Sequence, residues 1–169
     1  MQTINKTPSS QYKIRFHDCD MFGHLNNARY LDYMIAARQD HLQDNYQFRF
    51  SDYYSQNRGW VVTHHEIQYL KPARFDETIT ITSSVLGVTN DALHVEIMML
   101  NENGTQLKAL LRSTLTYINL QTGKRELHPP TLIKWAENLI TPVVGSTIQE
   151  RISHIKQELL LQAQIDSAA

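Results

Sequence analysis

A single long amphipathic helix is the first element that the pattern of apolar and polar residues predicts. It covers residues 27–43, where apolar side chains recur at helical spacing: Tyr30, Leu31, Met34, Ile35, Ala37 and Leu42. The polar pair Asn26-Asn27 stands at its start, and asparagine is a favoured N-cap because its side chain accepts a hydrogen bond from a free N–H of the first turn. Before the helix, alternation in residues 12–16 predicts a first strand, and residues 1–10 are expected to be a loose polar lead-in.

Strand patterns dominate the chain after a polar connection at residues 44–58, which has room for a short helical turn. Alternating and β-branched stretches predict strands at residues 60–70, 78–88, 93–99 and 107–118. The Asn103-Gly104 pair predicts a hairpin turn, because both central residues of a type I′ turn need positive φ. A short helix is expected at residues 131–140. One long helix followed by a run of antiparallel strands indicates an α+β fold.

The last part of the chain predicts a further amphipathic helix. Pro142 and Gly145 end the preceding helix, and apolar residues then recur at helical spacing: Ile148, Ile152, Ile155 and Leu159, widened by Leu160, Leu161 and Ile165. An isolated helix of this length is marginal in water, so we expect it to pack on its own sheet or on a neighbouring subunit. We therefore divide the chain into a domain at residues 1–141 and a C-terminal helical extension at residues 142–169.

Composition and charge exclude several classes of protein. The 169 residues suffice for one domain with a sizeable core, and a net charge of −1 without a basic run argues against a nucleic-acid-binding surface. No segment is apolar enough for a membrane span, and the N-terminus lacks the apolar core of a signal peptide. The single cysteine, Cys19, cannot form an internal disulfide and fits a reducing compartment. We therefore expect a cytoplasmic protein.

The candidate chemistry lies in residues 16–31, which read FHDCDMFGHLNNARYL. Asp20 and His24 come just before the predicted helix, whose free N–H groups and positive dipole end favour developing negative charge. A carboxylate, an imidazole and an oxyanion site are the groups needed for attack of water on a carbonyl. Asp18 is expected to be structural.

This stretch resembles the active-site segment of hotdog-fold acyl-CoA thioesterases of the 4-hydroxybenzoyl-CoA type. Its pattern D-x-x-G-H-x-N-N-A-R-Y-L is most similar to the branch of bacterial long-chain acyl-CoA thioesterases, and a second match follows at residues 69–77, YLKPARFDE. The two segments stand in the expected order, and the resemblance covers residues 11–140. It implies a hotdog fold, which is a curved antiparallel sheet wrapped around one long helix, here with an added C-terminal helix.

The resemblance also implies site residues, a substrate and an oligomeric state. The catalytic candidates are Asp20, His24 and Asn27, the last through its backbone N–H. The substrate-binding candidates are Gly23, Asn26, Tyr30, Lys71 and Arg74. Lys71 and Arg74, with Arg112 as a weaker candidate, would contact the phosphates of CoA. The resembling enzymes hydrolyse acyl-CoA without a cofactor and build each site from two chains, so a homodimer or homotetramer is expected.

Several alternatives stay open. Asp20 fits equally as general base for water or as a nucleophile that forms a mixed anhydride. His24 could donate a hydrogen bond to the thioester or to Asp20, or it could act as the base, because imidazole changes charge near neutral pH. The chain is also compatible with an acyl-carrier-protein thioesterase or a non-catalytic acyl-thioester-binding protein.

Other readings are disfavoured by particular residues. Phe22 stands where plant acyl-carrier-protein thioesterases have an asparagine, which argues against their mechanism as a whole. Ile35 stands where the family often has an acid, which argues against a mechanism that uses a second carboxylate on the helix. A dehydratase of this fold would space its Asp and His five apart, whereas Asp20 and His24 are four apart. A metal site is not expected, because the possible ligands around Cys19 match no familiar zinc spacing.

Overall fold

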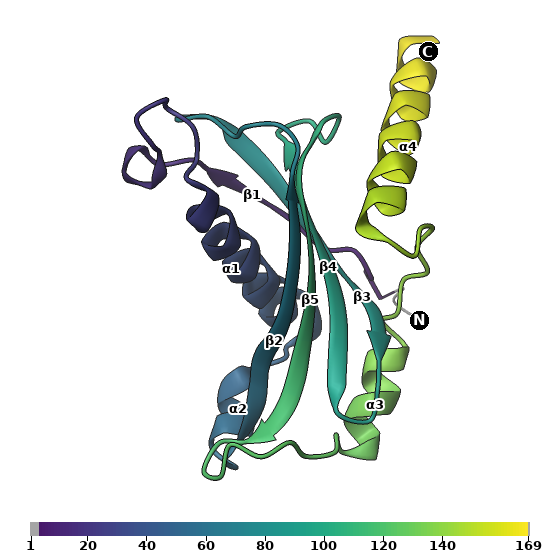
Figure 1. Ribbon diagram of the computed structural model, residues 1–169. Helices are drawn as coiled ribbons and strands as arrows, with labels where there is room; N and C mark the ends of the chain where they lie inside the picture. The colour runs from purple at the N-terminus through teal and green to yellow at the C-terminus, as the bar shows by residue number, and fades with distance from the viewer. Residues whose placement is uncertain (1–3, 169) are drawn as a thin grey trace.

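A curved antiparallel sheet forms the centre of the structure. The computed structural model describes residues 4–168. Its five strands are β1 (Ser9–Lys13), β2 (Arg58–Tyr69), β3 (Thr78–Val88), β4 (Ala92–Asn101) and β5 (Leu107–Asn119). They pair in the order β1-β3-β4-β5-β2, so β1 and β2 are the two edges (Figure 1). β2 to β5 match the four strands predicted after residue 58 to within two residues at each end.

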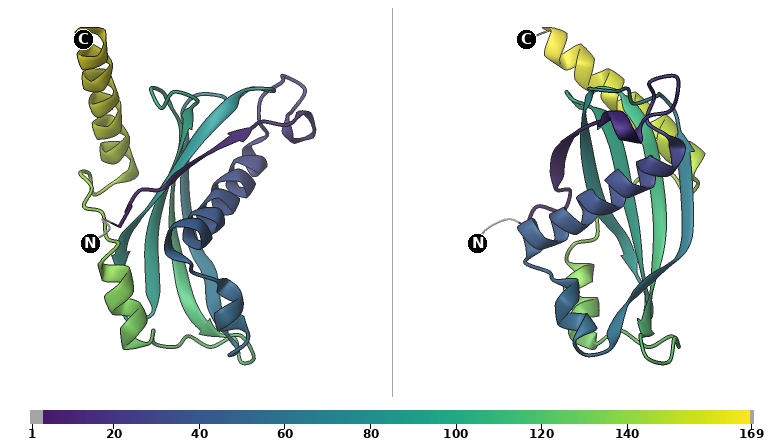
Figure 2. Two further views of the ribbon diagram at one scale, coloured as in Figure 1. Left: turned by 180° about the vertical axis from the view of Figure 1, so that it is seen from behind. Right: turned by 90° about the vertical axis from the view of Figure 1, so that its left-hand side faces the viewer.

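The predicted long helix, α1 (Asn27–Tyr46), packs on the concave face of this sheet and crosses it diagonally (Figure 2). The Asn26 side chain accepts a hydrogen bond from the Ala28 N–H at 3.0 Å, which confirms it as the N-cap. Apolar residues of α1 meet inward-facing strand residues in one core cluster, whose largest fully buried members include Met34, Ile79, Ile81, Ile97, Met99 and Leu111. Three residues longer than predicted, α1 ends where Gln47 adopts a left-handed conformation with φ of 54°.

Two short helices lie at the lower end of the sheet in Figure 1. α2 (Phe50–Tyr54) lies beside β2, within the connection that was predicted to have room for a helical turn. α3 (Pro130–Glu137) lies near the end of β3, and it begins one residue before the helix predicted at residues 131–140 and ends three residues before its end. Phe48, just after α1, stacks on Trp135 of α3 and contacts Trp60 of β2, with ring centroids 5.2 and 5.7 Å apart. This aromatic cluster joins the helices to the sheet.

The last helix, α4 (Ile148–Ala168), lies on the opposite, convex face (Figures 1 and 2). Its first turns bury Ile148, Ile152 and Ile155 against three sheet residues, Leu100, Leu107 and Leu110. Its last turns extend past the end of the sheet and leave three apolar side chains exposed: Leu160, Leu161 and Ile165. Within residues 4–168, α4 and the other helices all fall short of the length and apolar character that a membrane crossing requires.

A buried carboxylate ties α4 to the sheet. Glu96 of β4 is 1% exposed, and its two oxygens accept from the Arg112 Nε at 3.1 Å and the Arg151 Nε at 2.9 Å. Arg112 also donates to the carbonyl oxygens of Gly145 and Ser146, just before α4. Gly145 has φ of +103°, and a Cβ there would lie 2.5 Å from the Arg151 nitrogen, so only glycine fits this turn.

The bounds predicted for the first strand are wrong. Residues 9 and 10, assigned to the loose lead-in, pair with β3, whereas the chain leaves the sheet after Lys13 and forms a 3₁₀ turn, η1 (Phe16–Asp18). The alternation predicts a strand as far as Phe16 because an apolar residue in a strand pattern is expected to be buried, but Phe16 lies in the turn and is 78% exposed. The part of the predicted lead-in at residues 1–3 lies outside the described residues.

We predict that Glu96→Ala destabilises the fold without disordering the candidate site. The substitution removes the shared counter-ion of two mostly buried guanidinium groups and leaves Arg151 only the more distant Glu158 at 3.8 Å, and breaking such a buried pair typically costs about 3 kcal/mol or more. For a chain of this size the melting temperature should fall by roughly 10 °C. Thermal unfolding checks this against Glu137→Ala, which removes an exposed carboxylate from α3. Equal melting temperatures for the two variants would contradict the stabilising role of Glu96.

Candidate active site

Two segments that are far apart in the sequence meet at the start of α1. The Leu25 N–H donates to the Ala73 carbonyl at 2.8 Å, and the Phe75 N–H donates to the Gly23 carbonyl at 2.9 Å. Gly23 adopts φ of +72°, a backbone conformation that side chains with a Cβ rarely take. These backbone bonds hold residues 19–26 against residues 69–77, so the two motifs of the sequence form one structural unit.

The Asp20 carboxylate is oriented by this loop. One oxygen, Oδ1, accepts from the backbone N–H groups of Phe22 at 2.9 Å and His24 at 3.2 Å. The other oxygen, Oδ2, has no partner in residues 4–168. A contact between the Asp20 carboxylate and the His24 imidazole was one of the predicted roles, but the structure joins these residues through the His24 backbone. The imidazole itself makes no hydrogen bond within the described part of the chain.

Asp18 is engaged elsewhere. It is 9% exposed and accepts a hydrogen bond from the Tyr33 hydroxyl of α1 at 2.9 Å. The side chain therefore holds η1 against the helix and does not line the cavity beside Asp20. This placement agrees with the structural role expected for Asp18.

The first residue of α1 offers a free donor. As at any helix start, the Asn27 N–H has no intrahelical partner, and no other acceptor in the described residues takes it. Tyr69 fixes this residue from the sheet side, because its hydroxyl donates to the Asn27 carbonyl at 2.9 Å. Burial raises the pKa of the Tyr69 phenol, which keeps it protonated as a donor at neutral pH.

A cavity of about 230 Å³ opens between these groups. It is lined by five of the predicted site residues, Asp20, His24, Asn27, Tyr30 and Lys71, together with Leu25, Tyr69, Leu70 and Pro72. The predicted residues Gly23 and Asn26 shape the loop and cap the helix but do not line the cavity. Tyr69 was not predicted as a site residue, although it opens the YLKPARFDE motif.

Tyr30 belongs to both core and cavity. It is 3% exposed, its hydroxyl accepts from the Ala73 N–H at 2.9 Å, and burial raises its pKa. Its ring packs edge-on against Tyr69 with centroids 5.1 Å apart. Tyr30 therefore fixes the 69–77 segment against α1 and forms part of the cavity wall.

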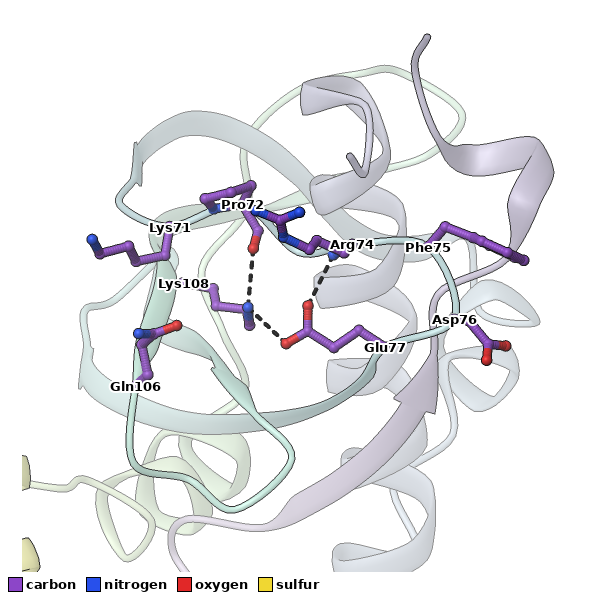
Figure 3. A pocket seen from close by; sticks show the side chains of 8 residues that line it. All are labelled: Lys71, Pro72, Arg74, Phe75, Asp76, Glu77, Gln106 and Lys108. Carbon is purple, nitrogen blue, oxygen red and sulfur yellow. Dashed lines mark hydrogen bonds and ion pairs between the residues drawn. The ribbon is translucent and has the colours of Figure 1, made fainter. Parts of the chain in front are cut away.

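An adjoining cavity of about 540 Å³ shares Lys71 and Pro72 with the first and carries Arg74 (Figure 3). At its centre the Lys108 ammonium contacts the Glu77 carboxylate at 2.7 Å and the Pro72 carbonyl at 3.0 Å. The Lys71 side chain extends away from this pair (Figure 3). Within residues 4–168 the Lys71 and Arg74 side chains form no ion pair, so both are available to an anionic ligand.

Arg112 does not join this cluster, which corrects its weaker assignment to CoA phosphates. Its guanidinium is taken up by Glu96 and the loop before α4 on the convex face. Among the described residues, no three His, Cys, Asp or Glu side chains are placed to hold a metal ion.

The fold and the site together define a class of protein. A curved antiparallel sheet around one long helix is a hotdog fold, and one cavity at the helix start is lined by Asp20 and by Asn27, whose N–H has no partner among the described residues. That pairing can activate a nucleophile and bind an oxyanion, as acyl transfer to water requires.

Comparison with known proteins identifies the family. Residues 14–136 match the model of the thioesterase-like superfamily, and the chain therefore belongs to this family. It is 30% identical over 115 residues to the long-chain acyl-CoA thioesterase FadM of Escherichia coli (strain K12), an alignment that covers 68% of this chain and 86% of FadM. The enzyme class is accordingly thioester hydrolase.

Solved structures share the fold. The probable thioesterase YbaW from Escherichia coli superimposes with a TM-score of 0.67 at 28% identity, covering 79% of this chain and 98% of that one. A DHNA-CoA thioesterase from Staphylococcus aureus superimposes with a TM-score of 0.70 at 20% identity, covering 78% and 87%. The predicted hotdog fold is confirmed.

Proposed function

We propose that this enzyme hydrolyses acyl-CoA thioesters to a free carboxylic acid and coenzyme A. The observation that carries the proposal is that Asp20 and Asn27, the first residue of α1, line the same cavity. The similarity to an acyl-CoA thioesterase supports the substrate class. With acyl-CoA as substrate, we place the enzyme in the cytoplasm and in lipid metabolism.

In the proposed reaction Asp20 takes a proton from water while the hydroxyl adds to the thioester carbonyl. The carbonyl oxygen becomes negative and accepts a hydrogen bond from the Asn27 N–H, where the positive end of the α1 dipole adds to its stabilisation. Collapse of the tetrahedral intermediate breaks the C–S bond, and the sulfur leaves as the thiol of CoA with the proton that Asp20 had taken from water, which returns Asp20 to its carboxylate form. Direct attack by Asp20, followed by hydrolysis of the anhydride, uses the same geometry.

The neighbouring cavity fits the other end of the substrate. Lys71 borders both cavities and Arg74 lies in the larger one, so an extended CoA running outward from Asp20 would bring its phosphates to these two cations. Phosphates and guanidinium or ammonium groups form strong charge-assisted hydrogen bonds. His24 borders the cavity with an unengaged imidazole, and we assign it a hydrogen bond to the thioester.

We also propose that two chains associate through β2 and that α4 is an extension of a domain at residues 1–141. β2 is a twelve-residue edge strand with exposed Val61 and Val62, and a long free edge of this kind is a template for pairing with another chain. α4 lies beyond the family match at residues 14–136, yet the ion pairs of Glu96 dock it on the sheet.

Asp20→Asn should lower the rate of acyl-CoA hydrolysis by about 10²–10⁴-fold, the usual contribution of a positioned general base. Thiol release from palmitoyl-CoA measures this, and circular dichroism checks that the fold is kept. Asp18→Asn is the matched control and should reduce the rate less, as should His24→Ala.

A rate for Asp20→Asn within a few-fold of wild type would refute the assignment of Asp20. Tight binding of acyl-CoA without turnover by the wild type would instead indicate an acyl-thioester-binding protein.

The double variant Lys71→Ala, Arg74→Ala should raise the KM for acyl-CoA by about tenfold or more, because hydrogen bonds to charged groups contribute about 1.5–3 kcal/mol. The KM for the matching N-acetylcysteamine thioester, which has no phosphate, should not change. Lys124→Ala, an exposed lysine after β5, serves as control. An equal rise in KM for both substrates would show that Lys71 and Arg74 do not bind the phosphates.

Association through β2 predicts that Val61→Lys produces a monomer with little activity, because charged side chains oppose edge-to-edge pairing. Light scattering and thiol release at the same protein concentration test both parts. Leu127→Lys, which changes an exposed apolar residue between β5 and α3, should leave size and activity unchanged. A fully active monomer would contradict the proposal.

A further inference from the structure

A third cavity, of about 250 Å³, lies between the second half of α1 and the concave face of the sheet. Most of its lining is apolar or aromatic. The exposed members of the lining are at the β2 edge and on α1 and α2: Val62, Ile35 and Tyr54, at 45%, 44% and 50%, and Gln39. Of the lining residues from β3 and β4, Leu93 is partly exposed and the others are buried, with Val85 and Ile97 at 3% and 2%. The cavity therefore opens at β2 and closes toward β3.

Arg38 of α1 lines this cavity and is mostly buried. Its Nη1 donates to the Ser83 hydroxyl of β3 at 3.3 Å, and within residues 4–168 the guanidinium has no carboxylate partner. Burial lowers its pKa to about 10, so it remains charged at neutral pH. Because Ser83 belongs to β3, the charge lies near the closed end, three strands away from the β2 edge.

The surroundings do not neutralise this charge. Ser83 also bonds the Nδ1 of buried His41 at 2.8 Å, and burial and the nearby Arg38 both lower the His41 pKa, which keeps that imidazole neutral. Asp40, the next acid along α1, accepts from the Tyr12 hydroxyl at 2.6 Å. A charged group removed from water is costly unless it is paired. Elsewhere the protein follows this rule, since Arg112 and Arg151 share Glu96.

We propose that the cavity binds an apolar chain that ends in a carboxylate, and that Arg38 is the counter-ion of that carboxylate. The carboxylate has two possible sources. It is either the distal group of the acyl chain being hydrolysed, which would make thioesters of dicarboxylic acids the favoured substrates, or the head of a free carboxylic acid. The first source rests on the proposed function, whereas the second needs only the cavity and Arg38.

Binding of decanoate and of 1-decanol to the full-length protein tests the shared chemistry without catalysis. Calorimetry should show decanoate binding at least tenfold more tightly than decanol, since hydrogen bonds between charged groups contribute about 1.5–3 kcal/mol. Arg38→Met should abolish this preference and, because it removes a partly buried charge that has no acidic partner among residues 4–168, should not lower the melting temperature. Arg38→Lys should keep part of the preference, and Arg125→Met, an exposed control, should keep all of it.

Equal affinities for the two probes in the wild type, or an unchanged preference in Arg38→Met, would overturn the proposal. Equal affinities in the wild type would also be expected if a second copy of the chain supplied the counter-ion of Arg38.

Hydrolysis of decanoyl-CoA and of its ω-carboxy analogue then distinguishes the two sources. A kcat/KM at least tenfold higher for the ω-carboxy thioester, lost in Arg38→Met, assigns the distal carboxylate of the acyl group. Equal kcat/KM values together with tight decanoate binding assign the free acid. Failure to hydrolyse either thioester would refute the proposed function and leave the binding result to decide the role of Arg38.

Discussion

The packing of α1 on the concave face of the sheet is the interaction on which the rest of the structure depends. Burying a side chain such as Met34 stabilises a fold by about 1.5–3 kcal/mol, and the inward residues of β3, β4 and β5 supply the matching surface. In this packing the first turn of α1 lies against residues 69–77, where the Tyr69 hydroxyl donates to the Asn27 carbonyl. The free N–H groups of that turn thus become part of a cavity.

Arginine side chains are paired differently on the two faces of the sheet. On the convex face, two arginines converge on one buried glutamate, and the resulting ion pairs hold α4 in place. On the concave face, Arg38 is left with a single serine hydroxyl beside an apolar cavity. The arginines of the convex face find their counter-ion within the chain, whereas the counter-ion of Arg38 is the carboxylate of a bound ligand. A hydrolase that releases carboxylic acids is a setting in which such a ligand is abundant.

The site is built from short-range and long-range parts. The turn from Asp20 to Gly23 and the cap at Asn26 are local, because each bond joins residues within four positions. The wall opposite comes from the end of β2, where Tyr69 reaches the Asn27 carbonyl across 42 positions of sequence. The cavity therefore depends on the register of β2 with β5, which fixes where β2 ends and the 69–77 segment begins.

The sequence alone determined the elements and the candidate chemistry, since periodicity, capping and turn residues are local properties. It predicted α1, four of the five strands and α4 closely, and its resemblance to a thioesterase motif pointed to Asp20 and Asn27. It erred at β1 because an apolar residue such as Phe16 can be exposed at a turn. Only the tertiary structure decided which charges find partners: Arg112 and Arg151 meet Glu96, whereas Arg38 meets no acid in the described residues. An alternating pattern fixes the face of a strand on which a residue lies, but strand order, register and helix docking decide what lies beside it.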